Sequence, residues 1–167
     1  MDLFISIGKG LLLGGSIAVL SFFLDITFSK KSFIKLCNES SEKYIQAAEA
    51  VQRNMMVISP LAYGVIDQTF IDHNSAVFQY RNILSILGIH SVGYYVVHTA
   101  MHKFKKLYTI HSFHHQYDKI LLPSIGNAVS TMEFMIAYLL PFIIAAYLLR
   151  PNEISFIIPI GIIGLLN

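Results

Sequence analysis

Five of the chain's seven histidines fall within 18 residues and form two groups. His98 and His102 lie four residues apart, and His111, His114 and His115 follow closely. Residues three or four apart on a helix share a face, so each group can aim its imidazoles at one point. Imidazole is a neutral ligand that suits iron, zinc and copper, and it adds no charge at a membrane surface. We therefore predict that these five histidines bind metal.

The number of histidines bears on the kind of metal site. Five ligands exceed the four positions of a structural zinc site, so they favour two metals, or one metal that has further partners. The two remaining histidines are isolated. We expect His73 to be solvated, and His90 to be a buried hydrogen-bonded residue or an outer partner of a ligand.

Several other classes of site are excluded. Thr99, Ala100 and Met101 separate His98 from His102, so the helix lacks the glutamate of a zinc protease. There is no Gly-x-Ser-x-Gly elbow and no phosphate-binding loop. The single cysteine excludes an intrachain disulfide and a cysteine-rich zinc site. A net charge of +2 without a basic run excludes nucleic acid as a partner.

The composition indicates which elements position the histidines. The 167 residues are 54% hydrophobic and only 13% charged, whereas soluble domains carry about 25% charged residues. We predict an all-α integral membrane protein with four to five transmembrane or membrane-embedded helices, because backbone groups in lipid must bond within their own segment. The apolar stretches are Leu3–Phe28, Asn54–Ile71, Ile83–Val97, Met132–Leu149 and Ile154–Leu166.

Details of these stretches predict further features. The last two are joined by four residues and should form a hairpin. Pro60, Pro141 and Pro159 should kink their helices. A cleaved signal peptide is the weaker alternative for the first stretch, because no small-residue cleavage pattern follows it.

Two polar regions, residues 29–53 and 98–131, hold nine of the 12 basic residues. Two spans separate them, so both lie on one side, and the positive-inside rule predicts that this side is cytoplasmic. Within the first region, Glu39–Arg53 is predicted to be a helix along the membrane surface, or alternatively a solvated connector.

The two histidine groups, with Leu107-Tyr108 before the second, resemble the fatty acid hydroxylase / sterol desaturase superfamily of membrane-bound non-haem di-iron oxygenases. The 13-residue step from His98 to His111 is typical of it. Weaker similarities are Asn54–Pro60 and Glu133. The resemblance begins near residue 50, and it divides the chain into an N-terminal transmembrane helix with connector, 1–53, and a partial hydroxylase-like domain, 54–167.

The resemblance implies a function in lipid biosynthesis. Two iron ions, held by the five histidines, would use dioxygen to hydroxylate or desaturate a fatty acyl chain or a sterol. Glu133 would contact a metal-binding residue without binding the metal itself. Cytochrome b5 and a reductase would supply electrons, and the endoplasmic reticulum would be the location in a eukaryote. The nearby Tyr94, Tyr95 and Tyr108 are expected only to pack or to anchor at the interface.

The sequence also departs from the family pattern. Ser130, Thr131 and Met132 stand where many members place a histidine before the glutamate. No histidine follows His115, whereas the family has a third box after the last hairpin. We therefore predict a truncated or partial member. Two alternatives remain: a non-catalytic membrane protein that binds metal or acts as a scaffold, and a purely structural membrane protein.

Overall fold

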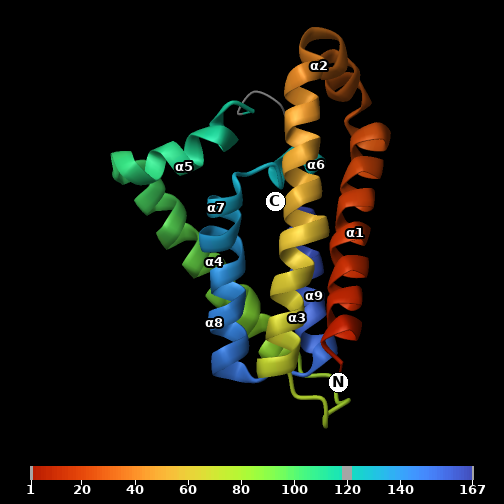
Figure 1. Cartoon of the computed structure of the whole chain (residues 1–167), viewed down its shortest axis with the longest axis vertical. Coiled ribbons are helices and arrows are strands. Elements are labelled where there is room, and N and C mark those ends of the chain that lie inside the picture. Colours follow the sequence, from red (N-terminus) through yellow and green to blue (C-terminus); the bar gives the residue numbers. More distant parts are fainter. Residues whose placement is uncertain (1, 118–121, 167) are drawn as a thin grey trace.

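The computed structural model describes residues 2–117 and 122–166, and their regular elements are helices (Figure 1). In chain order they are α1 Leu3–Phe28, α2 Lys30–Arg53, the π-helix η1 Asn54–Ile58, α3 Ser59–Phe70, α4 Tyr80–Lys103, α5 Lys105–His115, α6 Pro123–Gly126, α7 Thr131–Glu133, the π-helix η2 Phe134–Leu139, α8 Leu140–Leu149 and α9 Glu153–Leu166.

Within residues 2–117 and 122–166, three helical stretches are long and apolar enough to cross a membrane: α1, α4, and the α7–η2–α8 segment Thr131–Leu149. This finding confirms the predicted all-α membrane fold. The predicted third span, Ile83–Val97, was too short. His98 and His102 continue α4 to Lys103, because histidine interrupts an apolar run without interrupting a helix.

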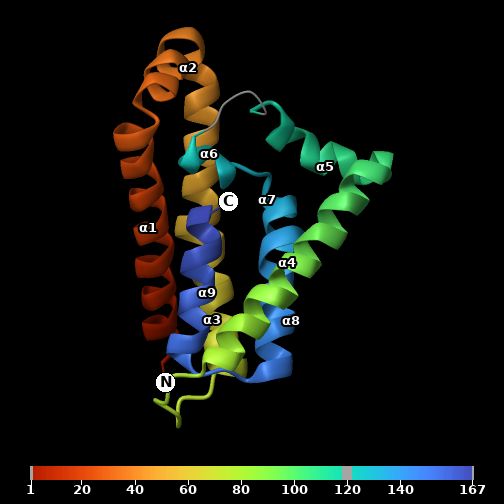
Figure 2. The ribbon, with the colours of Figure 1, turned by 180° about the vertical axis from the view of Figure 1, so that it is seen from behind.

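The helices run mainly along one direction, and their connections gather at two ends (Figures 1 and 2). The start of α1, the loop after α3 and the α8–α9 connection lie at one end. The α1–α2 turn and α5 lie at the other end, where α5 leaves the end of α4 at an angle. The start of α2 and α5, which carry Lys30, Lys31, Lys35, Lys105 and Lys106 of the two basic regions, thus lie at the same end, and the cytoplasmic location of that end stays a prediction.

The prediction for Glu39–Arg53 is right about a helix that starts near its first residue, but wrong about its position as a separate surface helix. Ser40 breaks α2 with non-helical dihedrals (φ −157°, ψ 55°). The part of α2 after Ser40 passes through η1 into α3, with right-handed helical dihedrals at the junctions, and these stretches lie in line (Figure 1). The buried Ala47, Ala50 and Val51 lie on this segment. Neighbouring helices cover its apolar face, and an amphipathic pattern alone does not distinguish such a cover from lipid. The predicted division after residue 53 stays a prediction.

The contact between α1 and the η1–α3 segment depends on small residues. Gly10 and Gly14 lie four apart on α1, and a Cβ on Gly14 would come within 2.1 Å of the Met55 carbonyl oxygen. Pro60 explains why the Met55 carbonyl is not taken up by a hydrogen bond within its own helix. In the i→i+5 pattern of η1, the N–H of residue 60 would bond Met55, and proline has none. Close approach through small residues four apart is a usual way for membrane helices to pack.

The helices accommodate their prolines in two ways. Pro60 and Pro141 each follow a π-helical turn, and α9 continues through Pro159 as one helix. The predicted hairpin of the last two helices is only partly right: a short connection joins α8 to α9, but α8 packs mainly on α4, whereas α9 packs on α4 and α1. Arg150 ends α8 in the left-handed conformation, and Asn152 Oδ1 accepts a hydrogen bond of 3.0 Å from the N–H of Ser155 in α9.

Candidate metal centre

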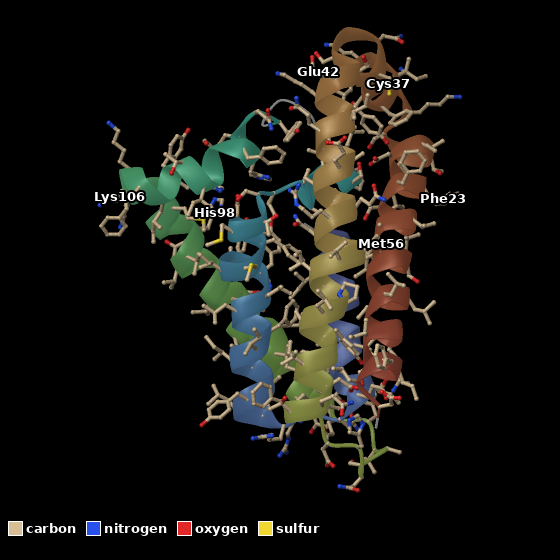
Figure 3. All side chains as sticks on the ribbon, viewed as in Figure 1. Phe23, Cys37, Glu42, Met56, His98 and Lys106 are labelled. Carbon is tan, nitrogen blue, oxygen red and sulfur yellow. The ribbon has the colours of Figure 1, made fainter. Side chains whose placement is uncertain are left out.

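A sharp turn between α4 and α5 brings the two histidine groups together. Phe104 has extended backbone dihedrals between two helical residues, so α5 leaves α4 at an angle (Figure 2). His98 lies in the angle that α4 and α5 form with α7 (Figure 3). The chain therefore places the last turns of α4 against the inner face of α5.

Three ring nitrogens converge at this turn. The Nε2 atom of His102 lies 3.2 Å from Nε2 of His98 and 3.2 Å from Nε2 of His111. One ligand atom from each of the three residues lies within 4.8 Å of the others. Two nitrogens bound to one metal ion at about 2.1 Å are separated by about 3.0–3.4 Å. The observed spacing therefore suits a shared ion.

His114 and His115 belong to the same cluster of rings. The His115 ring centroid lies 4.5 Å from that of His111 and 4.9 Å from that of His102, and the His114 ring stacks on His111 at 5.7 Å. All five predicted histidines are therefore neighbours. Among the described residues, His98, His102 and His111 are the three whose ligand atoms converge closely enough to share one metal ion, and we call this place the shared point.

Glu133 lies on the opposite side of His111 from this point. Its Oε1 atom is 2.6 Å from the Nδ1 atom of His111, and both residues are fully buried. Because Nδ1–H donates to the carboxylate, the Nε2 lone pair of His111 faces His102. Ser130 fixes the glutamate backbone, since its Oγ accepts a hydrogen bond of 3.2 Å from the N–H of Glu133.

The proton arrangement indicates that these residues fit a metal ion. With the proton of His111 held at Nδ1, one proton on Nε2 of His102 can serve only one of its two 3.2 Å contacts. The buried Nδ1 of His98 has no hydrogen-bond partner either. A cation would accept lone pairs from all three Nε2 atoms at once. Imidazole donors suit iron, zinc or copper.

A comparison with known families supports the resemblance. The family model described as fatty acid hydroxylase matches residues 83–167, just over half of the chain. The chain belongs to the fatty acid hydroxylase family. No curated protein and no solved structure matches it significantly. The match includes all five histidines and Glu133, whereas the weaker resemblance at Asn54–Pro60 lies outside it.

The pKa of His111 is low. Burial, and after it the neighbouring His98 and His115, lower the pKa of His111 to about 4. The His111 imidazole of the folded, metal-free protein is therefore neutral above about pH 4, which is the state in which imidazole binds metal.

This shift predicts how stability depends on pH. The pKa is lower in the folded state than the ordinary value of 6.5, so the unfolded chain binds more protons between about pH 4 and 6.5. We expect the unfolding temperature of the metal-free protein in detergent to fall as the pH falls from 6.5 to 4. The gap between wild type and His111→Asn should shrink over the same range. A constant gap would contradict this prediction.

Sequence reasoning missed part of the surroundings. The Tyr94 ring stacks on His98 at 5.2 Å, and Tyr138 packs edge-on against Tyr94 at 5.3 Å. His90 is buried with its ring 4.3 Å from that of Phe142. The four-residue spacing of His90, Tyr94 and His98 on α4 was an available signal. Nothing in the sequence relates Tyr138 to them.

The other residues noted in the sequence lie further from the shared point. Tyr108 is partly exposed and stacks near His115 at 5.9 Å, and Tyr95 is exposed. His73 is not merely solvated, because its Nε2 atom lies 3.1 Å from the backbone oxygen of Asp67.

Asn54 has a positioning role that its resemblance alone did not define. Its side-chain amide donates a hydrogen bond of 2.9 Å to the carbonyl of Val129, 75 residues away. The Asn127 amide likewise donates to the carbonyl of Gly164 at 2.8 Å. Both bonds hold the segment that leads into α7. They therefore support the position of Glu133 behind His111.

Proposed function

We propose that this member of the fatty acid hydroxylase family is a membrane-bound, iron-dependent oxidoreductase. It would hydroxylate or desaturate a fatty acyl chain or a sterol with dioxygen, in lipid biosynthesis. The observation that carries the proposal is the convergence of three Nε2 atoms, with Glu133 behind one of them. Two bound iron ions would supply the dioxygen chemistry that side chains lack.

Each residue would have a definite task. His98, His102 and His111 would hold metal, and His114 and His115 would provide further nitrogen donors beside them. Glu133 would keep the proton of His111 on Nδ1, so that Nε2 remains available as a ligand. Glu133 is thus a positioning residue, which is the role that the resemblance implied.

A small apolar cavity in the bundle bears on where the apolar tail of a substrate would enter. The cavity is small, about 50 Å³, and is lined largely by apolar side chains, among them Phe134, Tyr138 and Phe142. Tyr138 also contacts Tyr94, whose ring stacks on His98. This aromatic contact joins the cavity wall to the histidine cluster. Ligand sites in helical bundles are commonly apolar spaces between helices, so this side of the histidine cluster is where we place the substrate tail.

The remaining partners belong to the same proposal. A cytochrome b5 and a reductase would deliver the electrons that the reaction needs. In a eukaryotic host, the protein would reside in the endoplasmic reticulum as a multi-pass membrane protein.

The metal content of purified protein tests the proposal. We expect bound iron in the wild type and a loss of at least about tenfold in iron affinity for His98→Ala, His102→Ala and His111→Ala. His73→Ala is the matched control, because it removes a histidine outside the cluster and should leave the iron content unchanged.

Oxygen uptake in lipid vesicles separates the alternatives. Iron-dependent uptake that yields an oxidised lipid would support the enzyme. Bound metal without uptake would favour the non-catalytic metal-binding alternative. Unchanged metal content in the three cluster variants would refute the metal site and favour a purely structural protein.

A further inference from the structure

The junction between α4 and α5 carries three lysines around an exposed aromatic ring. Lys103, Lys105 and Lys106 are all exposed, and Phe104 between them is 61% exposed. We call these four residues the lysine corner. Tyr108 lies one turn further along α5 and is also exposed. Basic and large apolar side chains are thus presented together at one turn.

The positive charge of the lysine corner is not compensated locally. No aspartate or glutamate occurs between Asp72 and Asp118, so α4 and α5 contain no acidic residue. Glu133, on α7, is buried against His111. Within the described part of the chain, no carboxylate pairs with Lys103, Lys105 or Lys106. The corner therefore offers unpaired cations to a ligand from outside.

The position of the corner fits the boundary of a membrane. The candidate span α4 ends at Lys103, and α5 then leaves at an angle to it (Figures 1 and 2). Lys106 projects from the outer edge of this turn, whereas His98 lies on its inner side (Figure 3). Lysines and aromatic rings at the end of a span are typical of the headgroup region.

We propose that the lysine corner binds the headgroup phosphates of anionic phospholipids, with the Phe104 ring inserted beside their acyl chains. The lysines provide the charge complementarity, and the apolar ring at the apex favours a lipid surface over an acidic soluble protein. The inference requires no metal at the histidines, so it stands or falls separately from the proposed oxidoreductase function.

The sequence offers a direct probe, because the chain has no tryptophan. Phe104→Trp introduces one fluorophore at the apex of the lysine corner. In vesicles, we expect brominated phosphatidylglycerol to quench it half-maximally at a mole fraction about tenfold lower than brominated phosphatidylcholine. Raising the salt concentration from about 0.1 M to 1 M should reduce this preference, because the Debye length falls from about 10 Å to 3 Å.

Charge variants in the Phe104→Trp background provide the controls. The triple change Lys103→Gln, Lys105→Gln and Lys106→Gln should abolish the preference for the anionic lipid. The matched change Lys30→Gln with Lys31→Gln, two exposed lysines of α2 at the same end, should preserve it. Equal quenching by both lipids, or a preference that survives the triple change, would overturn the proposal. Quenching by neither lipid would overturn it as well, and would leave an acidic protein as the candidate partner.

Discussion

Replacing Glu133 by alanine is expected to weaken metal binding by the purified protein by about 10- to 100-fold. The carboxylate accepts the Nδ1–H of His111 at 2.6 Å in a fully buried position. Without it, the proton can move to Nε2, and the imidazole then turns a donor towards the metal. Iron content after dialysis against a graded series of chelator concentrations measures the loss.

Glu133→Gln is the matched control for this prediction. The glutamine oxygen can still accept the Nδ1–H, so metal affinity should fall less than in Glu133→Ala. The two variants also separate the positioning effect from a loss of stability. Glu133→Ala leaves the buried Nδ1–H of His111 without an acceptor, which costs about 1–3 kcal/mol in unfolding free energy, whereas Glu133→Gln keeps an acceptor. Wild-type affinity in both variants would show that Glu133 does not position a ligand.

A second large effect is expected at Gly14. Its Cβ would lie 2.1 Å from the backbone oxygen of Met55, which cannot move as a side chain does. Gly14→Ala should therefore force α1 away from η1 and destabilise the protein by about 1–3 kcal/mol or more. The unfolding temperature in detergent measures the change.

Gly8→Ala on the same helix is the control, because nothing lies within 4 Å of its Cβ position. Alanine is also the better helix former, so this variant should be as stable as the wild type or more stable. Equal stability of the Gly14 and Gly8 variants would mean that α1 does not need the close contact with Met55.

The histidine cluster was predictable because its geometry is largely local. The four-residue steps from His98 to His102 and from His111 to His115 fix which rings share a helix face. The turn at Phe104 was not predictable, since the residues around it would continue a helix equally well. Its extended backbone is nevertheless what brings His111 to 3.2 Å from His102.

The supporting contacts depend on pairs far apart in the sequence. Glu133 is 22 residues from His111, and Asn54 is 75 residues from Val129. Local patterning carries no information on such pairs, and only the resemblance drew attention to Glu133 and Asn54. The wrong placement of Glu39–Arg53 has a similar cause, because an apolar stripe does not specify whether lipid or another helix covers it.

The π-helical turn η2 has a consequence for how this chain tolerates insertions and deletions. Glu133 precedes the turn and contacts His111, while Tyr138, five residues later, contacts Tyr94 beside His98. An α-helix would point two side chains five positions apart in quite different directions, but an i→i+5 turn brings them nearly into line. Loss of a single residue from 134–139 would keep the segment helical and long enough for the bilayer. It would nonetheless rotate one of the two contacts out of reach, so the length of this short stretch is as constrained as the identity of the ligands.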